Sequence, residues 1–350
     1  VVSGEWPRRR PMTPRERILM ALRHEESDFV PYTVSVDEEV AGRLDEHYGT
    51  PDWRKRIVHQ IASAGVDLHR DQRPDGTWRD AFGTTWVDGN IFHTVDVPLK
   101  EPTLEGYELP ELLPDEELEQ MRERLEKTPD LFRHAGIGLS FFERAWALRG
   151  FEDLLADFAE NPSFIGELFD ALMELHLPIV DRLCTLPVDC IRFGDDFGAQ
   201  RGVLMGTTHW REVLKPRLQQ MYGGAHEHGK YVMIHSCGDN SPIIEDLIEI
   251  GVDIFNPFQP EAQDVYAMKR EYGKYITFNG GIGTQELLPR GTPEQITAEV
   301  ERLCEEIGAG GGFILGTTKP ILPDVPTENA VACFEAIVGQ GERVGAASHG

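Results

Sequence analysis

The second half of the chain alternates short apolar segments with amphipathic helical segments. From about residue 160 onward, each apolar segment is followed by a turn and then by a helical pattern. This alternation predicts parallel strands whose connecting helices cover the sheet. No Gly/Ser-rich linker, low-complexity segment or short-period repeat interrupts it. The sequence therefore predicts an α/β fold built from successive strand-helix units.

The expected strands are almost numerous enough for a barrel. Apolar segments predict strands near 29–36, 133–139, 188–193, 231–235, 252–255, 275–279 and 312–316. Helices are expected after Thr13 and Thr292, where capping boxes stand, and over 114–127, 161–184, 208–228 with a break at Pro216, and 241–251. We predict a (β/α)8 TIM barrel as a single domain over 13–340, with a disordered extension at 1–12 and a flexible tail at 341–350.

Composition restricts the partners and the compartment. A formal net charge of −26 argues against binding the phosphate backbone of nucleic acid. No apolar stretch reaches the roughly twenty residues of a membrane helix, and the first residues lack the apolar region of a secretory signal. We expect a cytoplasmic protein that binds neither nucleic acid nor membrane. The five cysteines are odd in number and widely spaced, so they are expected to be reduced thiols.

A histidine and a cysteine follow the expected strand at 230–234. His235 and Cys237 are two residues apart, and side chains two apart on an extended segment point to the same side. Imidazole and thiolate together suit Zn²⁺ better than Mg²⁺ or Ca²⁺, which prefer oxygen ligands. The pair predicts a zinc site. The alternative is a structural histidine beside a buried cysteine that acts as a small hydrophobe.

Other expected strands also end in polar residues or glycine. Working residues of a parallel barrel lie at the carboxyl ends of its strands. Asp195 and Asp196 are therefore candidates for acid–base catalysis or for orienting a metal-bound histidine, with strand-end capping as the alternative. Glu143 is a further catalytic candidate, unless it forms a helix-start ion pair with Arg144. The candidates for substrate binding at the other strand ends are Asn256, Gln259, Asn279, Gly281 and Gln285.

Four histidines have no partner at ligand spacing and are expected to lie on the surface or in the core. They are His134, His209, His226 and His228.

Five motifs resemble the uroporphyrinogen decarboxylase superfamily, and the match runs in order from about Thr13 to Val338. The motifs are Gly194-Asp-Asp, His235-Ser-Cys-Gly, Gly251-Val-Asp-Ile-Phe-Asn-Pro, Gly280-Gly-Ile-Gly-Thr-Gln, and Gly312-Phe-Ile-Leu followed by Pro323-Asp-Val-Pro-Thr-Glu-Asn. The resemblance implies a (β/α)8 barrel of one of two kinds. One kind is the haem-pathway decarboxylase, which needs no metal. The other is a zinc-dependent methyltransferase that moves methyl groups between corrinoids and thiols or serves O-demethylation.

The motifs favour the methyltransferase kind. The decarboxylases carry arginines near the N-terminus that bind substrate carboxylates, and the equivalent segment here, 29–37, contains none. His235 and Cys237 match the methyltransferase motif. The resemblance therefore implies a zinc-dependent methyltransferase or O-demethylase component that acts on a small molecule together with a corrinoid protein. Homodimerisation is a further expectation.

Lys319 departs from that pattern, because it stands where coenzyme M methyltransferases have a second cysteine. Either a carboxylate (Asp195, Asp196 or Asp239) completes the zinc shell, or the site has lost zinc. Without zinc, Lys319 is a catalytic candidate that binds a substrate carboxylate, which favours a decarboxylase acting on a smaller acid. A third alternative is a non-catalytic barrel that binds a small molecule.

Overall fold

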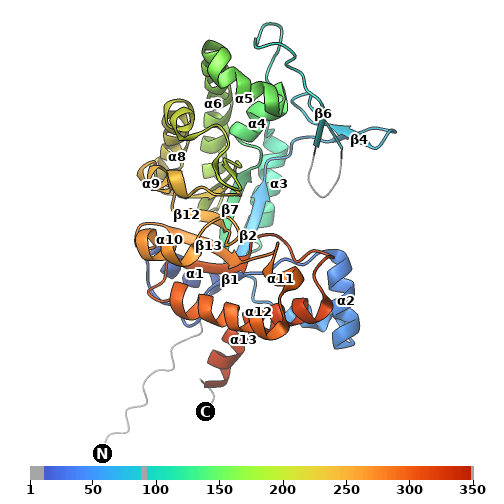
Figure 1. Ribbon diagram of the computed structural model, residues 1–350, viewed down its shortest axis with the longest axis vertical. Coiled ribbons are helices and arrows are strands. Elements are labelled where there is room, and N and C mark those ends of the chain that lie inside the picture. The colour runs from blue at the N-terminus through green and yellow to red at the C-terminus, as the bar shows by residue number, and fades with distance from the viewer. Residues whose placement is uncertain (1–11, 88–92, 348–350) are drawn as a thin grey trace, which may run out of the picture.

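The barrel consists of eight parallel strands in one sheet (Figure 1). The structure is a computed structural model that describes residues 12–87 and 93–347. Strand order is β1-β14-β13-β12-β11-β8-β7-β2, and every neighbouring pair is parallel. The strands are β1 (Tyr32–Thr33), β2 (Ile61–Gly65), β7 (Phe132–Ile137), β8 (Cys190–Gly194), β11 (Tyr231–His235), β12 (Ile254–Phe258), β13 (Thr277–Ile282) and β14 (Phe313–Thr317).

This nearly closed sheet confirms the predicted (β/α)8 TIM barrel. β1 and β2 are the two ends of the sheet, and β1 is extended by an isolated bridge between Val36 and Ile321. The register places Gly194 of β8 opposite His235 of β11, and His235 opposite Asn256 of β12. The carboxyl ends of these three strands therefore lie at the same end of the barrel.

Helices cover the outside of the sheet. Thr13 and Thr292 form the predicted capping boxes at α1 and α12. The helices are α1 (Pro14–Leu22), α2 (Glu38–Tyr48), α3 (Asp115–Glu126), α4 (Phe142–Arg149), α5 (Phe151–Glu160), α6 (Pro162–Cys184), α7 (Thr207–His209), α8 (Lys215–Glu227), α9 (Ile244–Glu249), α10 (Val265–Tyr272), α11 (Leu287–Arg290), α12 (Pro293–Arg302) and α13 (Thr327–Ala347).

Two helical segments differ in detail from the expectation. The segment 208–228 is helical and interrupted close to Pro216, which stands in the first turn of α8. The interruption is a π-helical turn at Trp210–Leu214, directly before α8. At the C-terminus, α13 continues to Ala347, so a helix occupies residues 341–347, which the sequence predicts to be a tail. Residues 1–11 of the expected N-terminal extension lie outside the described residues.

A small antiparallel sheet between β2 and α3 was not predicted. Its strands are β3 (Asp71–Gln72), β4 (Thr77–Arg79), β5 (Thr85–Val87) and β6 (His93–Asp96). Trp78 and Trp86 stack with ring centroids 5.5 Å apart, and both are buried. Asp80 binds Arg144 of α4 at 2.7 Å, and both side chains are fully buried. These contacts attach the small sheet to the helix that begins beside the carboxyl end of β8.

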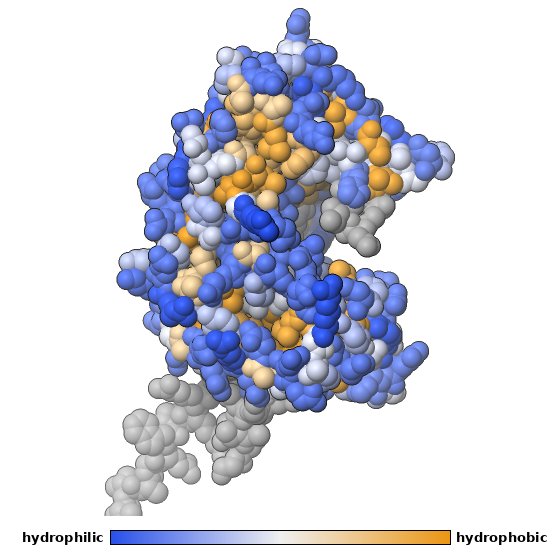
Figure 2. Space-filling view, in the orientation of Figure 1, coloured by the Kyte–Doolittle hydropathy of each residue, from blue (hydrophilic) through white to orange (hydrophobic). Residues whose placement is uncertain are grey.

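The barrel interior is apolar at the end remote from these strand termini. A buried cluster there contains Phe132, Cys190, Met233, Ile254 and Ile314. Polar side chains therefore occupy only the layers nearer the carboxyl ends. The five cysteines are free, and much of the face in Figure 2 is hydrophilic. In the part of the chain that the structure describes, no helix is long and apolar enough to cross a membrane.

Candidate metal centre

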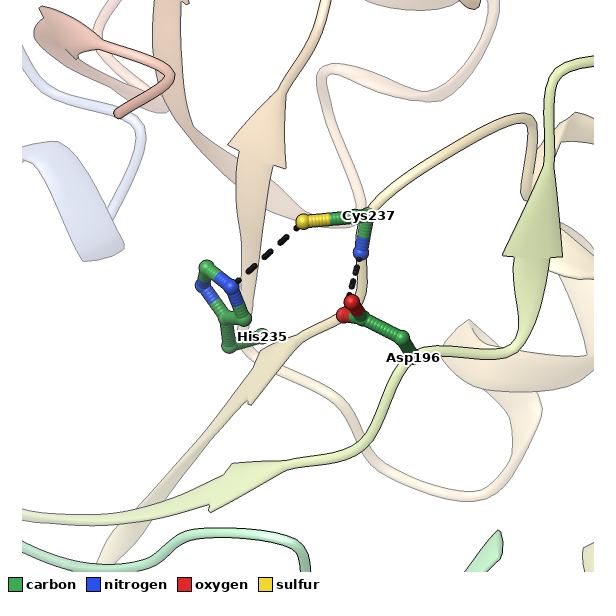
Figure 3. Close-up of side chains that lie close together, drawn as sticks. All are labelled: Asp196, His235 and Cys237. Atoms are coloured by element: carbon green, nitrogen blue, oxygen red, sulfur yellow. Dashed lines mark hydrogen bonds between the residues drawn. The ribbon is translucent and has the colours of Figure 1, made fainter. Parts of the chain in front are cut away.

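Three potential metal ligands converge at the carboxyl ends of β8 and β11. Asp196 follows β8, His235 ends β11, and Cys237 lies two residues further on (Figure 3). One ligand atom from each lies within 4.8 Å of the other two. His235 Nε2 is 3.6 Å from Cys237 Sγ, and Asp196 Oδ1 accepts a 2.8 Å hydrogen bond from the Cys237 amide. We call Asp196, His235 and Cys237 the metal trio.

Hydrogen bonds across four strands fix the orientation of His235. Asn279 donates its Nδ2 to the backbone carbonyl of Ile314 at 3.1 Å, so its Oδ1 is an acceptor. Asn256 Nδ2 donates to that Oδ1 at 2.9 Å and to the Asn279 carbonyl at 3.2 Å. The Oδ1 of Asn256 therefore faces His235 Nδ1, 2.6 Å away, and accepts a hydrogen bond from the Nδ1–H group. Nε2 is left with a lone pair on the side of Cys237, as a metal ligand requires.

The donor set of the metal trio suits zinc. A thiolate, an imidazole and a carboxylate are all zinc ligands, and catalytic zinc sites use three protein ligands and keep one position open. In the protein alone, burial and then the charge of Asp196 raise the pKa of the Cys237 thiol to about 12. A bound cation reverses this effect because it stabilises the thiolate.

The sequence left open which of three carboxylates would complete the zinc shell, and the structure distinguishes them. Asp239 Oδ1 accepts from the amide and hydroxyl of Ser241, which makes it a local turn cap. Asp195 is fully buried and accepts from the amides of Phe142 at 2.9 Å and Glu143 at 2.7 Å. Among the described residues, only Asp196 groups with His235 and Cys237. It is therefore the carboxylate best placed to complete the shell.

Asp195 holds the start of α4 beside the metal trio. Burial raises the pKa of its carboxyl to about 7, although the backbone amides that it binds act in the opposite direction. Its contacts favour the capping alternative, in which Asp195 positions Glu143 instead of meeting the substrate.

Glu143 lies close to Asp196, and its carboxyl favours the protonated form. Burial and then the charges of Asp196 and Asp195 raise its pKa well above the ordinary value. The expected alternative, an ion pair with Arg144, does not form, because Arg144 binds Asp80. The Glu143 carboxyl therefore lies next to the metal trio in surroundings that favour its protonated form.

Lys319 is exposed, and its positive charge lowers the pKa of both His235 and Cys237. Its ammonium group thus lies near the metal trio. Among residues 12–87 and 93–347 it makes no hydrogen bond or ion pair. That arrangement is compatible with binding an anionic group at the mouth of the site.

The predicted substrate-binding residues mostly support the loops. Asn256 and Asn279 orient His235, and Gln259 is buried with its Oε1 accepting from the Gly238 amide at 3.2 Å. A Cβ on Gly281 would lie 3.2 Å from the Phe313 ring. The Gln285 side chain is exposed, and the backbone N–H of Gln285 donates to Glu261 Oε1 at 2.8 Å.

Two peptide backbones touch beside Cys237. A Cβ added to Gly198 would lie 2.4 Å from the Cys237 carbonyl oxygen, and one added to Gly238 would lie 2.5 Å from the Gly198 carbonyl. Gly198 belongs to a short hairpin of β9 (Gly198–Ala199) and β10 (Gly202–Val203), and the Asp239 amide donates to Ala199 at 2.7 Å. Only glycine permits this approach.

Sequence reasoning missed Arg192. Its charge acts on His235, Cys237, Asp196 and Glu143, so it is close to the metal trio. The signal was available: an arginine interrupts the apolar strand at 188–193, on the same face as Cys190 and Gly194.

The fold and the metal trio define a parallel barrel with a polar centre at the carboxyl ends of its strands. The family model of uroporphyrinogen decarboxylase (URO-D) matches residues 136–339, more than half of the chain. The chain belongs to the uroporphyrinogen decarboxylase family, whose members are enzymes that include decarboxylases and methyltransferases.

Individual relatives come from both kinds of enzyme. Over 175 residues the chain is 30% identical to the uroporphyrinogen decarboxylase of Pseudoalteromonas translucida, covering 47% of this chain and 48% of the relative. Over 133 residues it is 25% identical to a methylated-thiol–coenzyme M methyltransferase of Methanosarcina mazei, covering 38% and 34%. The chain thus spans about half or less of the length of these curated relatives.

A solved structure shows the same fold. A methyltransferase from Methanosarcina mazei superposes with a TM-score of 0.67 at 19% identity, covering 95% of this chain and 99% of the other.

Proposed function

We propose that this protein is a zinc-dependent methyltransferase or O-demethylase component, with the metal held by Asp196, His235 and Cys237. The observation that carries the proposal is the convergence of the three donors, with the His235 lone pair fixed toward Cys237. The similarity to methyltransferases supports it. A corrinoid on a partner protein is the proposed methyl donor or acceptor, as the family resemblance implies.

Bound zinc would acidify a thiol or polarise an ether oxygen. The chain's own residues prepare the site for this chemistry. Asn256 holds the His235 ring in place through Nδ1. Burial and the charge of Asp196 raise the pKa of Glu143, which makes it a candidate proton donor beside Asp196. Lys319 supplies positive charge near the metal trio, which favours an anionic group there.

Decarboxylation of a small carboxylic acid is the second candidate. The observations in its favour are the 30% identity to a uroporphyrinogen decarboxylase and the exposed Lys319 ammonium group. In this alternative Lys319 binds the substrate carboxylate, Glu143 supplies a proton, and turnover needs no metal.

Metal analysis tests the proposal. Protein purified without chelator and supplied with zinc should contain about one zinc per chain by mass spectrometry, as expected for a single three-ligand site. Cys237→Ser should lose the metal. Cys304→Ser is the matched control because Cys304 is also half-buried but stands outside the metal trio. Zinc at background in the parent protein, or zinc retained equally by Cys237→Ser, would refute the metal site.

A methyl-transfer assay then separates the alternatives. The zinc-loaded protein should accelerate transfer of the methyl group from methylcobalamin to a small thiol, which forms a thioether, releases the thiol proton and leaves cob(I)alamin. The absorbance spectrum of the cobalamin follows the reaction. Metal-independent release of carbon dioxide from a carboxylic acid would favour the decarboxylase. Ligand binding without either reaction would favour a non-catalytic barrel.

A further inference from the structure

A basic cavity lies along strands β2, β7 and β8, and one of its lining residues, Arg192, is close enough to the metal trio for its charge to act on it. Its volume is about 410 Å³, and residues of β2, β7, β8 and α3 line it. The residues that matter for its chemistry are Ser63, Arg124, His134, Gly136, Gly138 and Arg192. The chain as a whole carries a net charge of −26, so a cavity with two arginines and no acidic lining residue is unusual for it.

Arg192 brings an unpaired positive charge into this cavity. Its side chain runs along the inner face of β8 toward the metal trio, because a Cβ on Gly194 would lie 3.9 Å from its Nη1. Within the described residues, the guanidinium group makes no hydrogen bond or ion pair. Guanidinium keeps its charge even when burial lowers its pKa, as it does here. Half-buried cations without a partner are costly, so this charge favours a bound anion.

His134 adds a hydrogen-bonding group to the same wall. Its Nε2 is 2.9 Å from Ser63 Oγ, while its Nδ1 is buried without a hydrogen-bond partner. Burial and the charge of Arg192 lower the pKa of His134 to about 3, which keeps the ring neutral. By contrast, His226 and His228 contact aspartates and His209 packs against Phe158. Of the four histidines predicted to be structural, His134 is therefore the one that lines this cavity, and it also has a buried nitrogen without a partner among the described residues.

Two glycines make room for Arg192 and for a ligand. A Cβ on Gly136 would lie 3.1 Å from the carbonyl oxygen of Arg192 and 3.4 Å from the Cβ of Arg192. Glycine at this position therefore leaves space for Arg192. A Cβ on Gly138 would meet nothing within 4 Å. Arg124, which is exposed on α3, stands at the rim. The cavity is thus open at Gly138 and basic on one side.

We propose that this cavity binds the carboxylate or phosphate group of a small substrate whose reacting group lies at the metal trio. The proposal rests on the proposed function for the identity of the reacting site. Arg192 would bind two oxygens of the anion in a bidentate contact, which suits planar guanidinium, and the neutral His134 ring would form part of the same wall. A volume of about 410 Å³ lies within the range of small-molecule sites. The bound group would thereby orient the substrate toward Asp196, His235 and Cys237.

Anion binding can be measured without turnover. Benzoate and inorganic phosphate are the two probes, titrated separately into the full chain by calorimetry, with and without zinc. One of them should bind saturably, and the probe that binds tells which oxyanion the cavity prefers. Arg192→Met should weaken that binding by about 10-fold or more, because it removes a charge-assisted hydrogen-bond donor. Arg270→Met, on an exposed arginine of α10, should leave it unchanged.

Gly138→Val is a second, independent variant. It fills open space without a backbone clash, so it should abolish probe binding while circular dichroism shows a folded protein. It keeps the test decisive if Arg192→Met does not fold. No saturable binding of either probe, or unchanged binding in the folded variants, would overturn the proposal. Anion binding by a protein that holds no zinc would retain the cavity as an anion site and refute only the proposed function.

Discussion

Replacing Asn256 tests whether a residue outside the metal trio fixes the orientation of His235. Asn256 accepts from His235 Nδ1 at 2.6 Å and donates twice to Asn279. Asn256→Leu keeps a side chain of similar size but removes all three contacts. The Nδ1 proton of His235 then has no acceptor, and the ring is free to rotate or to carry its proton on Nε2, where it cannot bind metal.

The expected magnitude follows from these contacts. Losing the partner that orients a metal-bound histidine lowers metal affinity by about 10- to 100-fold, which is about 1.4–2.8 kcal/mol. The half-buried donors and acceptors left unpaired should also lower the free energy of unfolding by about 1–3 kcal/mol. Asn256→Asp keeps the acceptor toward Nδ1 and loses only the donor toward Asn279, so its zinc affinity should stay closer to that of the parent.

Competition with a chromogenic chelator gives the zinc dissociation constant of each variant. Asn161→Leu is the matched control, since it removes an amide that bonds to Asp157 at the start of α6, outside the metal trio. If Asn256→Leu binds zinc as tightly as the parent protein while Cys237→Ser does not bind it, the orientation of His235 does not depend on Asn256 and the reasoning is wrong.

Three further predictions concern charge. Asp80→Ala leaves Arg144 buried without its partner and should cost about 3–5 kcal/mol in urea unfolding; a loss below about 0.5 kcal/mol, as at a surface site, would contradict it. Lys319→Cys adds a thiolate near the metal trio and should slow zinc loss to chelator; an unchanged rate would show that this side chain points away. The hydrogen bond to Asp253 raises the pKa of His226, so its stabilisation is complete below the unfolded pKa of about 6.5 and disappears as pH rises through the folded value. The thermal midpoints of the parent and His226→Gln should therefore differ at acidic pH and converge at alkaline pH, whereas a constant difference would refute the linkage.

Most barrel strands were predictable because each is a short apolar run between turn signals. β2 was not, since its sequence Ile-Ala-Ser-Ala-Gly consists mainly of small residues and carries no apolar run. The antiparallel sheet escaped prediction for a different reason. Its strands have only two to four residues, and Trp78 and Trp86 are buried through contacts that form only in the folded chain.

The site was predictable where it depends on spacing and not where it depends on packing. A spacing of two residues at the end of β11 was enough to pair His235 with Cys237. Two adjacent aspartates, however, look equivalent in sequence. Only the folded chain turns Asp195 toward the amides of α4 and Asp196 toward Cys237. Likewise, no local pattern predicts that Asn256 and Asn279 form one hydrogen-bonded row across three strands.

The contact between Gly198 and Gly238 determines how this centre can change. Asp196 lies in the same loop as Gly198, and Cys237 precedes Gly238, so the spacing of two ligands follows the packing of two main chains more than the rotamers of two side chains. If these residues bind a metal, a larger or smaller ion would therefore require movement of the two loops and not only an exchange of side chains. Redesign for another metal would require the loop that carries Asp196 and Gly198 and the loop that carries Cys237 and Gly238 to be replaced together.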